Sequence, residues 1–120
     1  MKYILILLIL ATPAAAQDYS VRGNDDVFTP AALADMIHDR DLEYFDGGVS
    51  RYNADGSYAW TYADNNGGAV LTGTHDIQEG GVVCITYDAG PQRCDMFVMS
   101  AARLVLLTDD GQRYPLREIR

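Results

Sequence analysis

The chain has 120 residues, of which 48% are hydrophobic and 22% charged, with 11 glycines. This composition is ordinary for a globular protein and excludes collagen-like, low-complexity and wholly disordered chains. The 17 acidic residues outnumber the 9 basic ones, giving a net charge of −8 at pH 7. Nucleic acid and anionic membrane surfaces are poor partners because they are bound through basic patches, whereas a basic protein would be attracted. Excess acid is also consistent with a role in solubility alone.

The N-terminus has the three parts of a secretory signal peptide. Lys2 supplies the positive start, Ile4–Leu10 the apolar run, and Ala14–Ala16 the small residues before a cleavage point. The apolar stretch is too short to cross a membrane as a helix, and Pro13 interrupts it. We therefore expect cleavage after Ala16, no membrane span in the mature chain, and a location outside the cytoplasm.

Two cysteines, Cys84 and Cys94, are predicted to form a disulfide, because small exported domains usually pair an even number of cysteines. A three-residue loop over Asp88–Gly90, with Gly90 in the left-handed region, would place the two cysteines opposite each other on neighbouring strands. A metal-binding pair or a catalytic dithiol is the alternative, but these usually have C-x-x-C spacing.

One helix is predicted near the N-terminus, within Phe28–Arg40. Thr29 suits the N-cap and Pro30 the first helical position. Its buried stripe would consist of Leu33, Met36 and Ile37. Such a short helix with a narrow apolar face must pack on something larger.

From Tyr44 onward the hydrophobic period is two, and Asp-Gly and Gly-Gly turns separate the runs. The predicted strands cover residues 49–53, 57–63, 69–77, 82–87, 93–99, 103–108 and 112–119. Short turns leave no room for crossover helices, so the sheet should be antiparallel. We predict an α+β fold, with one N-terminal helix packed on a six- to seven-stranded antiparallel meander and closure into a barrel as a further option.

The domain organisation follows from these elements. A signal peptide over residues 1–16 would precede an irregular polar segment over 17–27, in which Asn24–Asp26 forms a solvated turn. A single α+β domain would then cover residues 28–120.

The residues able to carry chemistry form no catalytic or metal-binding motif. His38 is expected near the helix C-terminus, facing the helix dipole, and His75 lies in a strand beside Asp76, which points to the opposite face. No serine lies in a G-x-S-x-G motif, no H-E-x-x-H occurs, and Asn53–Ser57 lacks most of the calcium-loop pattern. We therefore predict no catalytic residues, no metal ligands and no cofactor.

Three aromatic residues form the candidate binding face. Tyr58, Trp60 and Tyr62 alternate with small residues, so they project from one face of one strand. Such a row could bind a glycan or a protein. The alternative is that the helix covers the row as core, which is favoured because the small residues between them cannot build a core themselves.

The order of these features resembles that in small exported alphaproteobacterial proteins of unknown function. In those proteins a leader, a helix starting T-P-x-x-L, a Y-x-x-D-G hairpin and a late G…C…C…D-G segment follow one another. The matching residues are Thr29, Pro30, Leu33, Tyr52, Asp55, Gly56, Gly73, Gly81, Cys84, Cys94, Asp110 and Gly111. His75 stands where these proteins commonly have an aromatic residue. The resemblance assigns no site residues.

A second resemblance is to bacterial inhibitors of C-type lysozyme, which are small, exported, disulfide-bonded β-barrels. The segment Asp110–Tyr114 is similar to their inhibitory loop, and the acidic charge suits a cationic target, but the helix does not belong to that family. From the residues we expect a non-catalytic periplasmic or secreted accessory domain that binds a partner, more readily a basic protein. The alternatives are an inhibitor of a cationic cell-wall hydrolase and a glycan-binding module.

Overall fold

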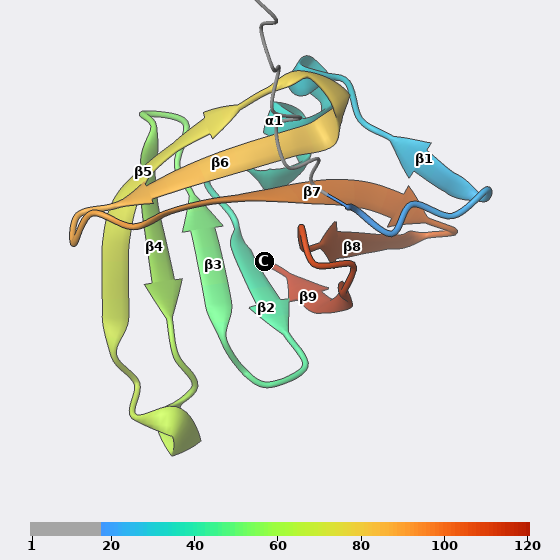
Figure 1. The fold of residues 1–120 in the computed structure, drawn as a ribbon. Helices are drawn as coiled ribbons and strands as arrows, with labels where there is room; N and C mark the ends of the chain where they lie inside the picture. Colours follow the sequence, from blue (N-terminus) through green and yellow to red (C-terminus); the bar gives the residue numbers. More distant parts are fainter. Residues whose placement is uncertain (1–17) are drawn as a thin grey trace, which may run out of the picture.

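The structure is a computed structural model that describes residues 18–120, so the predicted signal peptide over residues 1–16 lies outside the described residues. Eight strands form a closed antiparallel barrel in which successive strands are neighbours (Figure 1). They are β2 (Asp41–Tyr44), β3 (Val49–Tyr52), β4 (Ser57–Thr61), β5 (Val70–Ile77), β6 (Val82–Tyr87), β7 (Gln92–Ser100), β8 (Arg103–Leu107) and β9 (Arg113–Ile119). The last strand, β9, returns to pair with β2 and closes the barrel.

The predicted α+β class is wrong, because the protein is mostly β. Within residues 18–120 there is one α-helix, α1 (Pro30–Ile37), of 8 residues, and two short 3-10 turns, η1 (Asp64–Asn66) and η2 (Glu79–Gly81). The seven predicted strands are present, but β2 was not predicted. Because β2 pairs with both β3 and β9, this four-residue strand turns an open meander into a barrel.

The β6–β7 hairpin has the predicted register. Cys84 lies directly opposite Cys94, and the two form a disulfide. The turn between the strands contains Gly90 with φ 110°, a backbone conformation that residues with a Cβ rarely adopt. The predicted disulfide is therefore confirmed, and it suits an oxidising, extracellular type of environment.

Helix α1 covers one end of the barrel. The Oγ1 of Thr29 accepts a hydrogen bond from the Ala32 N–H at 3.2 Å, which confirms the predicted N-cap. The helix ends at Ile37, and Leu33 and Ile37 are fully buried in the main core. In Figure 1 the helix lies beside the β5–β6 connection, away from the β2–β3 and β4–β5 loops. We call the helix-covered end the closed end and the opposite end the open end.

The N-terminal segment covers the outside of the barrel. A second, smaller core consists of Met96, Val98, Val105 and Leu107, with Tyr19 and Val82 packed against it. These β7 and β8 residues alternate with residues of the main core, so both faces of these strands are buried.

The solvated turn predicted over Asn24–Asp26 is present only at Asn24. Asp25–Val27 forms strand β1, which pairs with the end of β7. The Asp25 carboxylate accepts two hydrogen bonds from Arg113 of β9, from Nη1 at 2.7 Å and from Nη2 at 3.0 Å. The side chain of Asp25 is fully buried, so this ion pair fixes the N-terminal segment to the barrel wall.

Candidate functional site

The open half of the barrel interior contains a cavity of about 720 Å³. This volume is typical of small-molecule sites. Its lining is mainly aromatic, with one ion pair and several carboxylates. The lining includes Tyr44, Phe45, Asp46, Ser50, Tyr52, Tyr58, Trp60, Tyr62, Leu71, Tyr87, Arg93, Asp95, Asp109, Asp110 and Tyr114.

The predicted aromatic row lies in this cavity. Tyr58, Trp60 and Tyr62 occupy alternate positions along and just beyond β4, and all three line the cavity. Tyr58 is only 4% exposed and belongs to the core, whereas Trp60 and Tyr62 are half-buried. The Trp60 ring contacts Tyr44 and Tyr62, with ring centres 5.7 and 5.8 Å away. Tyr58 is therefore part of the core, whereas Trp60 and Tyr62 form the wall of the cavity.

Gly48 leaves the space that the Trp60 ring occupies. A Cβ at residue 48 would lie 2.4 Å from the six-membered part of the indole, which is too close for any carbon contact. Ser50 and Trp60 are direct partners across β3 and β4, so the indole extends along the wall towards this glycine. The sequence thus provides a glycine where the ring needs room.

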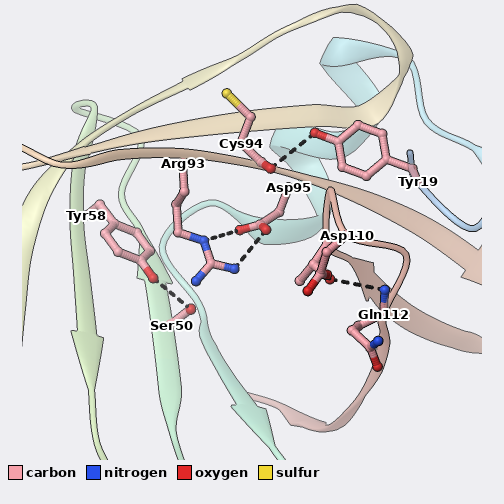
Figure 2. A network of polar contacts seen from close by, with 9 residues as sticks. Tyr19, Ser50, Tyr58, Arg93, Cys94, Asp95, Asp110 and Gln112 are labelled. Atoms are coloured by element: carbon pink, nitrogen blue, oxygen red, sulfur yellow. Dashed lines mark hydrogen bonds and ion pairs between the residues drawn. The ribbon is translucent and has the colours of Figure 1, made fainter. Parts of the chain in front are cut away.

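An ion pair lies inside the barrel. Arg93 donates from Nε to Asp95 Oδ2 at 3.0 Å and from Nη2 to Oδ1 at 2.8 Å (Figure 2). Asp95 is 2% exposed, whereas the Arg93 side chain is 47% exposed. The carboxylate is thus neutralised in a fixed geometry, and the guanidinium presents its remaining surface to the cavity.

Burial controls the protonation of the groups around this pair. Burial raises the pKa of Asp95, Arg93 lowers it in part, and the nearby Asp109 and Asp110 raise it further. Burial also raises the pKa of the Tyr44, Tyr52 and Tyr58 hydroxyls above their usual range. These tyrosines stay neutral near pH 7 and can donate hydrogen bonds.

Two tyrosine hydroxyls inside the barrel differ in their partners. The Tyr58 hydroxyl lies 3.1 Å from the Oγ of Ser50 and shares a hydrogen bond with it (Figure 2). The Tyr44 hydroxyl is buried and is the one buried side-chain polar atom within residues 18–120 that has no hydrogen-bond partner. Burial raises the pKa of the Tyr44 hydroxyl, and the Ser50 side chain lowers it in part. An unpartnered buried hydroxyl beside a cavity is available to a ligand.

The rim of the cavity is both apolar and acidic. Phe45, Leu71 and Tyr114 are 60%, 41% and 48% exposed, which is high for such large side chains. Asp46 lies on the same rim in the β2–β3 turn, and Asp109 and Asp110 lie in the β8–β9 turn. With Arg93 and Asp95 neutralising each other, the net charge around the cavity is negative.

The histidines lie outside the cavity lining, whereas Cys94 of the disulfide belongs to it. Cys84 and Cys94 form their bond on the outward side of the β6–β7 hairpin, and Tyr19 donates a hydrogen bond from its hydroxyl to the Cys94 carbonyl at 3.1 Å. His38 follows α1 and His75 lies in β5, and their Nε2 atoms are 3.1 Å apart at the closed end. Sequence spacing gave no sign of this pair because its members are 37 residues apart.

Sequence reasoning also missed Arg93 and Asp95 as site residues. Their spacing of two within a predicted strand places both on one face, and that signal was available. That these side chains point into the barrel is known only once the barrel is closed. Phe97, on the same face of β7 two residues after Asp95, then lies in the core.

The described chain shows neither a metal-binding cluster nor a spanning helix. Within residues 18–120 no group of three or more histidine, cysteine or carboxylate side chains is arranged to hold a metal ion. In the same range no helix is long and apolar enough to cross a membrane. No protein-family model, curated protein or solved structure matches this chain.

Proposed function

We propose that this protein is a non-catalytic binding domain of the periplasm or the extracellular space, and that its barrel cavity holds a ring-bearing small molecule. The observation that carries the proposal is the aromatic-lined cavity at the open end of the closed barrel. Barrel mouths are common sites for small ligands, and such sites combine apolar walls with a few fixed polar groups. Trp60, Tyr62 and Leu71 would supply the walls here.

The polar groups of the cavity favour an uncharged or cationic ligand over an anion. The positive charge of Arg93 is neutralised by Asp95, and Asp46, Asp109 and Asp110 surround the entrance. An anion would meet net negative charge, whereas a cation would be attracted to both carboxylates and aromatic faces. The unpartnered Tyr44 hydroxyl and the free side of Arg93 would hydrogen-bond to oxygen atoms of the ligand.

The absence of nucleophile–base geometry supports a binding role. The described residues that line the cavity include no histidine. Ser50, the serine among them, shares its hydroxyl with Tyr58 rather than with a general base. The Asp95 carboxylate is engaged by Arg93 through two hydrogen bonds, so it is poorly placed to accept a proton from a substrate.

The experiment uses three probes that share one ring system and differ in charge. 1-Naphthylmethylamine, 1-naphthalenemethanol and 1-naphthoate are titrated into the mature protein by isothermal calorimetry. We expect saturable 1:1 binding of the amine and the alcohol, and weaker or no binding of the acid. Failure of all three to bind at millimolar concentration would contradict the proposal.

A matched pair of variants locates the binding. Leu71 lines the cavity, whereas Val70 is its exposed neighbour on the opposite face of β5 and lies outside the lining. Leu71→Ala should weaken binding about tenfold, which corresponds to roughly 1.4 kcal/mol of lost apolar contact. Val70→Ala should leave the affinity unchanged. Equal effects of the two substitutions would place the probe outside the barrel.

The exposed rim favours a second candidate function, docking of a basic protein. Phe45, Leu71 and Tyr114 form an apolar rim with Asp46, Asp109 and Asp110 between them, a combination suited to a cationic partner surface. An inhibitor of a cationic cell-wall hydrolase would use such a surface. Binding of a C-type lysozyme with loss of its activity, weakened by Phe45→Ala and by added salt, would support this candidate over the first.

A further inference from the structure

A pair of histidines joins helix α1 to strand β5 at the closed end of the barrel. His38 is the first residue after α1, and His75 lies within β5. Their Nε2 atoms are 3.1 Å apart and their ring centres 5.3 Å apart. Each Nε2 therefore lies near the line that joins the ring centres, which is the geometry of a direct N–H···N hydrogen bond.

The backbone around His75 determines which nitrogen carries each proton. His75 Nδ1 lies 3.0 Å from the Ser57 carbonyl oxygen. A carbonyl oxygen can only accept, so His75 carries its proton on Nδ1, and the Nε2 of the neutral ring is an acceptor. His38 must then donate from Nε2 to His75. The arrangement assigns opposite tautomers to the two neutral rings.

The pair can take up one proton but not two. Protonation of His38 at Nδ1 leaves its Nε2–H in place, so the hydrogen bond to His75 survives. Protonation of His75 would put an N–H on its Nε2, which would then face the Nε2–H of His38. Two donors and two positive charges would meet at 3.1 Å, and the rings would have to separate.

The surroundings of His75 oppose its protonation. Burial and the neighbouring His38 lower the pKa of His75, while the Ser57 carbonyl and Asp76 partly raise it. The Tyr52 ring meets His75 edge-on, with ring centres 5.3 Å apart, and carries a neutral hydroxyl. Among the nearby carboxylates, Asp55 is engaged by Ser57.

A further carboxylate near the pair belongs to Asp39, which follows His38. Its Oδ1 accepts a hydrogen bond from the Ala54 N–H at 3.0 Å. None of Asp39, Asp55 and Asp76 hydrogen-bonds to an imidazole of the pair. Asp76 acts on His75 only through its charge, and burial outweighs this effect on the pKa of His75.

We propose that His38 and His75 form a proton-operated latch, which in its neutral form holds the C-terminal end of α1 against β5 and opens when the pair binds a second proton. Opening loosens the closed end without unfolding the barrel, because Leu33 and Ile37 stay in the core and the Asp39 N–H still donates to the Tyr52 carbonyl at 2.9 Å. The Tyr52 ring contacts His75 and also lines the cavity, so one side chain connects the latch to the proposed ligand site.

A shared metal ion is the competing use of two histidines. It would need both Nε2 lone pairs to converge on one point beside the pair, and zinc is usually held by at least three protein ligands. The observed nitrogens point at each other, and within residues 18–120 no third ligand joins them. The geometry therefore favours the hydrogen bond.

The experiment combines imidazole NMR with hydrogen exchange on the mature protein and does not depend on any cavity ligand. The chain has two histidines, so a sample labelled with ¹⁵N in the imidazoles gives two ring systems. Near neutral pH we expect the Nδ1–H tautomer for His75 and the Nε2–H tautomer for His38. On acidification to a pH at which the NMR spectrum shows His75 charged, the amide protection factors of Leu33 to His38 should fall several-fold.

The matched variant is His38→Gln. A glutamine amide can donate to neutral His75 and, after rotation, accept from charged His75, so the helix should keep its protection at both pH values. A wild-type helix whose protection does not change as His75 titrates would overturn the latch, as would the same acid response in His38→Gln. Stoichiometric zinc binding to both rings at neutral pH would also overturn it in favour of a metal site.

Discussion

Tyr44 and Tyr58 line the same cavity, but only the Tyr58 hydroxyl has a hydrogen-bond partner among the described residues. Tyr58 shares a hydrogen bond with Ser50, whereas the Tyr44 hydroxyl is buried without a hydrogen-bond partner among the described residues. Burying a hydroxyl without a hydrogen bond lowers the stability of the fold, and a hydrogen bond offsets that loss. Tyr44 and Tyr58 therefore contribute differently to stability although their side chains are the same.

Removing the two hydroxyls should therefore have opposite effects. Tyr58→Phe should lower the free energy of unfolding by about 1 kcal/mol, because the Ser50 hydroxyl loses its partner. Tyr44→Phe should leave it unchanged or raise it by up to about 1 kcal/mol, because no bond is lost. Urea unfolding monitored by Trp60 fluorescence measures both. Equal destabilisation by the two variants would show that Tyr44 has a partner in solution.

Arg93 is the counter-ion of the buried Asp95 carboxylate. Arg93→Met should lower the free energy of unfolding by about 3 kcal/mol near pH 7, because it leaves the Asp95 carboxylate buried without a counter-ion. The loss should shrink at acidic pH, where the carboxyl is neutral and costs less to bury. Denaturant unfolding of Arg93→Met across this pH range measures the loss.

The matched control for that variant removes both charges. Arg93→Met combined with Asp95→Leu should recover most of the lost stability, since an apolar pair of similar volume replaces the ion pair. If the double variant were less stable than Arg93→Met alone, the lost stability could not be explained by an unpaired charge on Asp95. The two side chains would then stabilise the fold through their packing.

The pair of Asp25 and Arg113 predicts a dependence of stability on pH. The Arg113 guanidinium lowers the pKa of Asp25 from 3.8 to about 2. A carboxyl with a depressed pKa in the folded state stabilises the fold above its unfolded pKa, and that contribution is lost as the pH falls from 3.8 towards 2. Asp25→Asn should therefore be less stable than wild type at about pH 6, and the difference should narrow at about pH 2.5.

The exposed pair of Asp41 and Arg51 is the control for Asp25→Asn. Both side chains of this pair are about two-fifths exposed and their charged atoms are 3.2 Å apart. Asp41→Asn should change the free energy of unfolding by less than about 0.5 kcal/mol at either pH. A loss as large as that for Asp25→Asn would show that burial does not distinguish the two ion pairs.

The bond between Cys84 and Cys94 should stabilise the fold and leave neither thiol free to react. Replacing Cys84 and Cys94 by alanine should lower the free energy of unfolding by on the order of 3 kcal/mol, because the bond closes a short loop in the unfolded chain. The measurement is thermal unfolding of the double variant beside wild type with and without reductant. An unreduced, unfolded wild-type protein that reacts with two equivalents of a thiol alkylator would contradict the bond.

Most strands could be predicted from sequence because their signal is local. From β3 to β9 the alternation of apolar residues and the turns between them define each strand within one or two residues. The Thr29 cap and Pro30 likewise define the start of the helix. The hairpin register of Cys84 and Cys94 follows from the length of one turn.

Closure of the barrel and the contents of the cavity could not be predicted because they depend on contacts between distant segments. The strand β2 has four residues, and its closing partner β9 lies near the other end of the chain. Without that closure nothing shows that Arg93 points inward or that Trp60 faces a cavity. The pairing of His38 with His75 depends on where α1 docks, which no local pattern specifies.

Chemical-shift mapping with 1-naphthylmethylamine would show whether a ring-bearing ligand enters the open half of the barrel. We expect saturable shifts at the Trp60 indole N–H and at the Tyr58 and Tyr62 rings, while Leu33 and Ile37 at the closed end stay unchanged. Trp60 is the single tryptophan, so its indole signal needs no separation from others. Shifts confined to the outer surface around Tyr19, or no saturable shift at the Trp60 indole, would show that the ligand does not bind inside the barrel.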